Sequence, residues 1–442
     1  MPVSPARVAA FEILLRIDQA DSYASELLHA QRLAKLSRED HGLSTELVMG
    51  VLRWRSVLDQ RISEYLTQPF AKLDLEVLTA LRLGAYQMLF LDRIPNHAAV
   101  DGSVELIKRA RKRSAAGMVN AVLRRLSNDF HFSQQQREGG HPAEQLQLAA
   151  HPQWLVERWA EVYGAEVTEK ICAYDQLAPK TTIRINDCEL VEELRREGVT
   201  LKPGSLLTSA SSADRGYITR TKAFRERRLI IQDEASQLVA LLVGKGDSLL
   251  DCCAAPGGKT RILAEQNPKS SVTAVELHPH RAALLKKLVP LENVRVISGD
   301  VRRLPLAMKF DRVLLDAPCS GTGTLARNPE IKWRLKLEDI PRLQAYQLEI
   351  LLSAMNQVAA RGRLVYSTCS LEPEENSDVI EKALSANSSF RVVDCRDELL
   401  RLKREGELAT EDMDRLLSGP YLRTIPGVHS YDGFFAAVLE RN

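Results

Sequence analysis

From about residue 247, the chain alternates short apolar runs with segments of helical periodicity. Each apolar run is bounded by turn residues, and the runs are SLLDCC, SVTAVEL, VRVISGD, DRVLLDAPC and GRLVYSTCS. The helical segments between or after them include KTRILAEQ, HRAALLKKLV and EENSDVIEKALS. This alternation predicts right-handed crossovers and a mainly parallel sheet that helices cover on both faces. We therefore predict an α/β domain over residues 241–442, with FFAAVLER as its last strand.

The preceding residues divide into three further parts. Apolar residues recur at helical spacing over 3–128, which predicts an all-α bundle over 1–130. A polar stretch with a Gly-Gly-His-Pro break predicts a linker over 131–150. Strand-like KTTIRIND and helix-like ELVEELRREG predict a small α+β module over 151–240. A chain of 442 residues has room for about three domains, which agrees with this division.

Charge and cysteine content exclude several classes of protein. With 60 basic and 58 acidic residues the net charge is +2, so any basic surface for nucleic acid must be local. Seven scattered cysteines, an odd number, argue against a disulfide framework and favour a reducing cytoplasm. The N-terminus reads as an amphipathic helix rather than a signal peptide, and no apolar run approaches the roughly 18 residues of a membrane span. We also expect no metal, because C-x-x-C is absent and the histidines lack ligand spacing beyond the HPH at 278–280.

The stretch DCCAAPGGKT, residues 251–260, ends like a phosphate-binding loop. A Walker loop requires a glycine at the position that Cys253 occupies here, and Pro256 removes an amide donor that would cradle phosphate. A Gly-x-Gly-x-x-Gly fingerprint is absent as well. What remains is a strand, a tight glycine-rich turn and a helix N-terminus, which together let the backbone approach a ligand closely.

Acidic residues end three successive strands of the predicted sheet. They are Glu276 after TAV, Asp300 after ISG and Asp316 after VLL. An acid at the end of the second strand, about 20 residues beyond the glycine-rich turn, suits a ribose diol, and Asp300 would suit an adenine amino group. A single such acid is usually a solvated loop residue, but three on one edge favour a ligand.

Cys319 follows the fourth strand and Cys369 follows the fifth. Adjacent parallel strands would bring both thiols to one edge of the sheet. Two small buried residues are the alternative, since cysteine often serves that purpose, and a metal is a weaker one.

Three motifs together resemble those of a known family. DCCAAPGGKT, DAPCSGTG and YSTCSLEPEEN closely resemble the RNA cytosine-5 methyltransferases, which have a Rossmann-like class I methyltransferase domain and use S-adenosylmethionine. The N-terminal helices, with GMVNAVLRRL, resemble the antitermination factor NusB. The pairing is similar to the bacterial 16S rRNA cytosine-5 methyltransferases of the RsmB (Fmu/Sun) type, over nearly the whole chain. The resemblance implies methylation of C5 of a cytosine in 16S rRNA, cytosine 967 in that type.

The resemblance also implies roles for individual residues. Cys369 would be the nucleophile that adds to C6 of cytosine, Cys319 would assist product release, and Asp316 would bind the base edge. Lys259 would lie near cofactor and base. The positions that correspond to the cofactor-binding ones are Cys253, Ala254, Ala255, Pro256, Gly257, Gly258, Lys259, Glu276, Asp300 and Asp316.

Candidate RNA-binding residues come from two sources. A basic cluster in the N-terminal bundle is either a solvated helix end or a phosphate-binding surface, and it comprises Lys108, Arg109, Arg111, Lys112 and Arg113. The resemblance adds Arg184 and Asn186 in TTIRIND, and Arg327 and Lys332 in RNPEIKW. Because a target base must leave its stack to reach a pocket, single-stranded or looped 16S rRNA is the expected partner. The alternatives are a tRNA cytosine or uracil target, or a non-catalytic RNA-binding or assembly factor.

Overall fold

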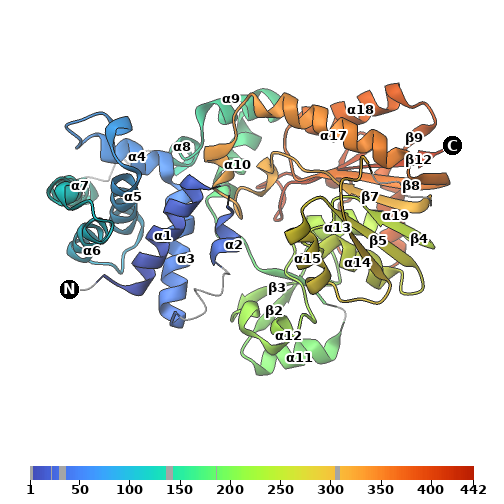
Figure 1. Cartoon of the computed structure of the whole chain (residues 1–442), viewed down its shortest axis with the longest axis horizontal. Coiled ribbons are helices and arrows are strands. Elements are labelled where there is room, and N and C mark those ends of the chain that lie inside the picture. Colours follow the sequence, from blue (N-terminus) through green and yellow to red (C-terminus); the bar gives the residue numbers. More distant parts are fainter. Residues whose placement is uncertain (1–2, 21, 29–35, 136–142, 186, 304–308) are drawn as a thin grey trace. The chain divides into compact units, whose positions relative to one another are not determined.

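The structure is a computed structural model that describes residues 3–20, 22–28, 36–135, 143–185, 187–303 and 309–442 (Figure 1). The chain divides into two compact units. The first comprises Met1–Ala178 together with the short segment Leu325–Arg334, and the second comprises Pro179–Thr324 and Leu335–Asn442. No helix among the described residues is long and apolar enough to cross a lipid bilayer.

The first unit is helical in its described residues. Its helices are α1 (Pro5–Gln19), α2 (Ala24–Leu28), α3 (Arg38–Arg53), α4 (Arg55–Ser63), α5 (Leu75–Phe90), α6 (Asn96–Arg109), α7 (Ala116–Gln135), α8 (Ala143–Ala149), α9 (Gln153–Tyr163), α10 (Ala165–Asp175) and α16 (Ile331–Arg334). Ser4 caps α1 by accepting a hydrogen bond from the Arg7 amide at 3.4 Å. Helix α5 is buried along most of its length, and α1, α3, α4, α6 and α7 pack against it. The predicted all-α bundle is therefore confirmed.

The structure adds detail at two of the predicted divisions. In the predicted linker 131–150, residues 131–135 end α7 and residues 143–149 form α8, while 136–142 lie outside the described residues. Residues 151–178, predicted as part of the α+β module, form α9 and α10 and belong to the helical unit. Trp159 on α9 and Ile171 on α10 are fully buried there. An amphipathic helix has an apolar face whose partner its own sequence does not specify.

A small α+β module opens the second unit. Its antiparallel sheet has the order β1-β3-β2 in the described residues, with β1 (Thr182–Arg184), β2 (Thr200–Pro203) and β3 (Ala210–Arg215). Helices α11 (Cys188–Arg196) and α12 (Lys222–Arg225) accompany the sheet, and α13 (Glu234–Leu242) leads into the larger domain. Ile183, Leu194 and Ile218 are buried in the core of the module.

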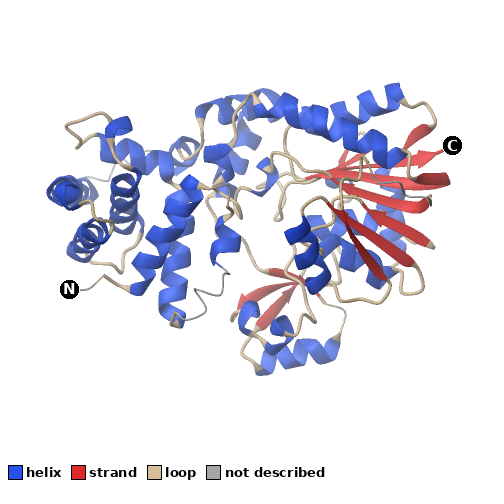
Figure 2. Cartoon of the chain, viewed as in Figure 1, coloured by secondary structure: helices blue, strands red, loops and turns tan. Residues whose placement is uncertain are grey.

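The larger domain is built on a sheet whose described strands run in the order β10-β11-β12-β8-β7-β4-β5-β6, with β9 paired to β12 (Figure 2). The parallel strands are β4 (Ser248–Asp251), β5 (Ser271–Glu276), β6 (Val294–Ser298), β7 (Phe310–Asp316) and β8 (Val358–Thr368). The antiparallel strands are β9 (Phe390–Val393), β10 (Leu417–Ser418), β11 (Tyr421–Arg423) and β12 (Phe435–Arg441). The predicted parallel strands are confirmed, and the additional antiparallel strands make the sheet mixed.

Helices cover both faces of this sheet (Figure 1). One face packs on α13, α14 (Gly258–Gln266) and α19 (Cys395–Arg404), and the other on α17 (Asp339–Met355) and α18 (Ser377–Ala386). Helix α15 (Pro279–Leu288) connects β5 to β6. The strand order reverses between β4 and β7, and open α/β sheets bind ligands beside such a reversal, at the carboxyl ends of the strands.

Candidate active site

The two cysteines predicted to meet do so at the carboxyl ends of β7 and β8. These strands are parallel neighbours in which Asp316 pairs with Ser367, so the residues that follow them emerge at the same edge. The sulfur atoms of Cys319 and Cys369 are 3.4 Å apart, both thiols are free, and both residues are half-buried. The hydrogen bond to Cys369, together with burial, raises the pKa of Cys319 well above its ordinary value. Cys319 is therefore held as a neutral thiol beside Cys369.

Asp316 is held from two sides. Its Oδ2 accepts a hydrogen bond from Lys259 Nζ at 2.6 Å, and its Oδ1 accepts one from Ser367 Oγ at 2.8 Å. The Lys259 ammonium also lies over the ring of Phe434, 5.0 Å from its centroid. The lysine and aspartate side chains are 12% and 29% exposed, so the ion pair is accessible to a ligand. The sequence analysis did not identify Ser367 or Phe434; the polar Ser367 directly after the run LVY was an available signal.

The glycine-rich turn continues β4 and ends at a helix. The Ala254 amide donates to the Val275 carbonyl at 2.9 Å, which holds the turn against β5. Gly257 has φ +116°, and a Cβ there would lie 2.5 Å from Leu285 Cδ1, so the close turn requires glycine. Helix α14 begins at the next residue.

Thr260 lies in the first turn of α14 and ties that helix to β4. Its hydroxyl donates to Asp251 Oδ2 at 2.7 Å, and burial raises the pKa of Asp251 to about 7. Burial also raises the pKa of Cys252 and of Cys253. The adjacent cysteines of the turn are therefore held as thiols rather than thiolates.

The remaining acids lie on the same edge of the sheet. Glu276 ends β5, is 4% exposed, and accepts a hydrogen bond from the His278 amide at 3.0 Å. Asp300 follows β6, and Arg302 donates to its Oδ2 at 2.6 Å and to its Oδ1 at 3.0 Å. This pairing lowers the pKa of Asp300, so the carboxylate stays charged. The parallel register of β4, β5 and β7 brings these strand ends together with Asp316.

Comparison with known proteins identifies the family to which the chain belongs. Residues 238–440 match the model described as 16S rRNA methyltransferase RsmB/F, residues 4–128 match the NusB family, and residues 151–211 match an RsmF/B-like ferredoxin-like domain. The "Probable ribosomal RNA small subunit methyltransferase B" of Bacillus subtilis is 34% identical over 100% of both chains. Ribosomal RNA small subunit methyltransferase B of Pseudomonas putida is 33% identical over 98% of both. The chain belongs to the RsmB/F family of 16S rRNA methyltransferases.

Solved structures share the fold of this chain. The crystal structure of PH0851 matches with a TM-score of 0.81 and 25% identity, over 100% of both chains. That of NSun6 from Pyrococcus horikoshii with SFG matches with a TM-score of 0.56 and 20% identity, over 66% of this chain and 98% of the other, and shows the shared fold. As a member of the RsmB/F family, the protein is an rRNA methyltransferase that uses S-adenosylmethionine.

The residues at the strand ends fit this cofactor. Gly257 lets the turn pack against Leu285, where a side chain would collide, and the turn leads into the N-terminus of α14, whose first backbone amides suit a polar ligand. The buried carboxylate of Glu276 supplies acceptors suited to ribose hydroxyls, and Asp300 supplies a charged acceptor at the next strand end. Bound S-adenosylmethionine supplies an electrophilic methyl group.

The basic cluster of the helical unit lies at the surface. Lys108 and Arg109 end α6, and they are exposed, as are Arg111 and Arg113. Lys112 is half-buried, and its ammonium pairs with Asp74 at 2.8 Å. Lys108 pairs with Glu105 at 2.6 Å. The cluster has the exposure that contact with RNA phosphates requires, although part of its charge is neutralised locally.

The RNA-binding residues implied by resemblance differ in their exposure. Lys332 is 1% exposed, and its ammonium donates to the carbonyls of Ala150 at 2.9 Å and Arg53 at 3.0 Å. The prediction that Lys332 contacts RNA is therefore wrong, because α16 buries it in the helical unit. Arg184 is half-buried, its side chain is 8% exposed and pairs with Glu407 at 2.9 Å, and its contact with RNA stays a prediction. Arg327 is half-buried, and Asn186 lies outside the described residues.

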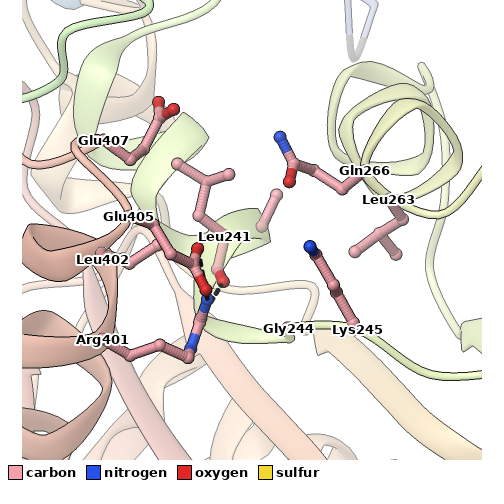
Figure 3. Close-up of a pocket in the computed structure, with 10 residues that line it drawn as sticks. Leu241, Gly244, Lys245, Leu263, Gln266, Arg401, Leu402, Glu405 and Glu407 are labelled. Carbon is pink, nitrogen blue, oxygen red and sulfur yellow. Dashed lines mark hydrogen bonds and ion pairs between the residues drawn. The ribbon is translucent and has the colours of Figure 1, made fainter.

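A pocket of about 350 Å³ in the second unit lies apart from the strand-end residues (Figure 3). Gly244 and Lys245, which precede β4, line it together with Gln266 at the end of α14. It is therefore at the amino end of β4, opposite the edge that carries Asp316. Arg401 in its wall donates to the Leu241 carbonyl at 2.8 Å and pairs with Glu405 at 3.0 Å. Arg401 and Glu405 are therefore paired within the protein.

Proposed function

We propose that this protein transfers a methyl group from S-adenosylmethionine to C5 of a cytosine in 16S rRNA, through a transient bond between Cys369 and C6. The observation that carries the proposal is the pair of free thiols at 3.4 Å, beside the carboxylate of Asp316, at the edge where the cofactor-binding turn also lies. By its resemblance to the RsmB type, we propose cytosine 967 as the target. The free cysteines are in keeping with a cytoplasmic enzyme.

Each side chain has a task in this reaction. The Cys369 thiolate forms a bond to C6, and the former C5–C6 double-bond electrons make C5 nucleophilic. After the methyl group has been accepted at C5, a base removes the C5 proton, and the C5–C6 double bond re-forms as the Cys369 thiolate leaves. Cys319, next to Cys369, assists this last stage.

Asp316 and Lys259 stabilise the target base once its charge has changed. Attack at C6 makes N3 more basic, and Asp316 hydrogen-bonds the base edge and stabilises the N3-protonated adduct. Lys259 and Ser367 fix the orientation of that carboxylate before the base arrives. The base must leave its stack to reach the thiols, so a looped or single-stranded region of rRNA is the proposed substrate form.

The test is incubation with methyl-labelled S-adenosylmethionine and unmethylated 16S rRNA, followed by mapping of the labelled base. We expect Cys369→Ala to abolish methyl transfer and Cys319→Ala to accumulate a covalent protein–RNA complex. Cys188→Ala, at an exposed cysteine of α11, is the control and should retain full activity. Full activity of Cys369→Ala would refute the nucleophile, and labelling of tRNA without rRNA would refute the substrate.

A further inference from the structure

A buried carboxylate lies behind both cysteines. Glu375, just after β8, is fully buried. Its Oε1 accepts hydrogen bonds from the Ser320 amide at 2.9 Å and from Gln347 Nε2 at 2.8 Å. Its Oε2 accepts one from Ser370 Oγ at 2.5 Å and another from Ser320 Oγ. Ser320 directly follows Cys319 and Ser370 directly follows Cys369, so one carboxylate binds the loops of both thiols.

The surroundings of Glu375 hold it in place. Its own carbonyl accepts a hydrogen bond from Tyr366 OH at 2.6 Å, and the hydroxyls of Ser320 and Ser370 are 2.9 Å apart. The next residue, Asn376, donates to the Ser370 carbonyl at 3.0 Å. Burial raises the pKa of Glu375, while the hydrogen bonds from Ser320 and Ser370 act in the opposite direction. Burying a carboxylate costs free energy that good hydrogen bonds offset, and here the donors come from both loops and from α17.

Other contacts join the loops without involving Glu375. The Leu371 amide donates to Thr322 Oγ1 at 2.8 Å, and the Gly323 amide donates to the Cys369 carbonyl at 2.8 Å. Removal of the Glu375 carboxylate should therefore leave the loops connected and folded, but free to shift relative to each other at Ser320 and Ser370.

We infer that Glu375 is a positioning residue that sets the separation of the Cys319 and Cys369 sulfur atoms. It touches neither substrate nor cofactor and acts through Ser320 and Ser370. Only the effect of this separation on catalysis rests on the proposed function. In that reaction, Cys369 must reach C6 while Cys319 stays close enough to assist release. A displacement of about 1 Å can cost roughly 100-fold in rate.

The first experiment measures the separation without catalysis. Phenylarsine oxide bridges two thiols that lie close together, and Cys369→Ser gives the background from other cysteines. We expect the wild-type protein to bind it through Cys319 and Cys369, and Glu375→Ala to bind it at this pair at least about tenfold more weakly. Glu381→Gln, an exposed residue of α18, is the matched control and should bind like wild type. Wild-type binding by a folded Glu375→Ala would overturn the inference.

The second experiment measures turnover. We expect Glu375→Gln, which keeps the side-chain volume and one acceptor, to lower kcat by roughly 10- to 100-fold with KM for RNA changed less than about threefold. Ser370→Ala should slow formation of the covalent complex, and Ser320→Ala should slow its release. An equal loss in all steps, in proportion to the unfolded fraction, would indicate a merely structural role and overturn the inference. If Cys369→Ala were active while arsenical binding still depended on Glu375, the proposed function alone would fail.

Discussion

Two lysines with acidic neighbours occupy opposite environments in this protein. Lys259 in the sheet unit pairs directly with Asp316 at 2.6 Å, and both side chains retain some exposure. Lys332 in the helical unit is buried, bonds to backbone carbonyls, and interacts electrostatically with the fully buried Asp175. Burial lowers the pKa of Lys332 and raises that of Asp175, which is the direction that desolvation imposes on each charge.

The difference separates a group that can act on a ligand from one that maintains the fold. The Lys259–Asp316 pair can exchange hydrogen bonds with an arriving base. The Lys332 cluster instead anchors the segment 325–334 within the helical unit, where Arg53 donates to the Ala326 carbonyl at 3.0 Å and Trp333 Nε1 to the Leu52 carbonyl at 2.7 Å. The same residue types therefore form an accessible ion pair in one place and a buried, packed cluster in the other.

The largest expected effect is on stability, from a change of the buried Lys332. Lys332→Met preserves the volume of the side chain but removes its hydrogen bonds and the cation beside Asp175. We expect the free energy of unfolding to fall by about 3–5 kcal/mol, measured by urea denaturation, because two buried carbonyls lose their donor and Asp175 loses a neighbouring cation. Asp175→Asn in the same protein should restore part of the loss.

The control for this prediction is Lys336→Met, at an exposed lysine, which should change stability by less than about 0.5 kcal/mol. Methyl transfer per folded molecule should stay within about threefold of wild type in Lys332→Met. An unchanged unfolding curve with lost RNA binding would contradict the comparison, since Lys332 would then serve RNA rather than packing.

The next effect is on the reaction rate, from a change at the candidate active site. Lys259→Ala leaves Asp316 with its hydrogen bond from Ser367 and removes the one at 2.6 Å. We expect kcat to fall by roughly 100-fold, measured with saturating RNA and S-adenosylmethionine. Stability should change by less than about 1 kcal/mol, because the pair is partly exposed. Lys245→Ala, at an exposed lysine, should keep the wild-type rate; a wild-type rate in Lys259→Ala would contradict the assignment.

The smallest effect concerns the exposed cations of α6 and the turn after it. Arg109→Ala with Arg111→Ala should weaken rRNA binding several-fold at moderate salt. The slope of log affinity against log salt should become shallower by about 1–2, because each phosphate contact contributes roughly 0.7–0.9. Arg404→Ala, at an exposed arginine of α19, should leave the slope unchanged. An unaltered slope in the double variant would mean that the cluster is a solvated helix end.

Sequence patterns predicted the part of the fold in which strands and helices alternate. Strand–helix alternation identified β4 to β8, and parallel pairing then placed Cys319 beside Cys369. Strands such as β10, with two residues, are too short to show periodicity and were not predicted. The contribution of Glu375 also depends on spatial neighbours, because Ser320 lies 55 positions away in the chain.

The sequence did not indicate which of its charged residues are buried. Lys332 lies in RNPEIKW, which reads as a basic surface loop, yet Glu330 and Lys332 are each 1% exposed. Their partners, Ala24 for Glu330 and Arg53 and Ala150 for Lys332, are distant in the sequence. The pairing of Arg184 also depends on a distant residue, since Glu407 lies 223 positions away. A charged residue becomes structural through partners that only the fold brings near.

The most direct test of the account is to identify the residue that carries RNA in the trapped complex. Cys319→Ala is incubated with 16S rRNA and S-adenosylmethionine, and the covalent complex is digested and analysed by mass spectrometry. The account predicts one nucleotide-bearing peptide, which contains Cys369 bonded to a cytosine methylated at C5. A nucleotide on Cys252 or Cys253, or the absence of any covalent complex during active turnover, would contradict it.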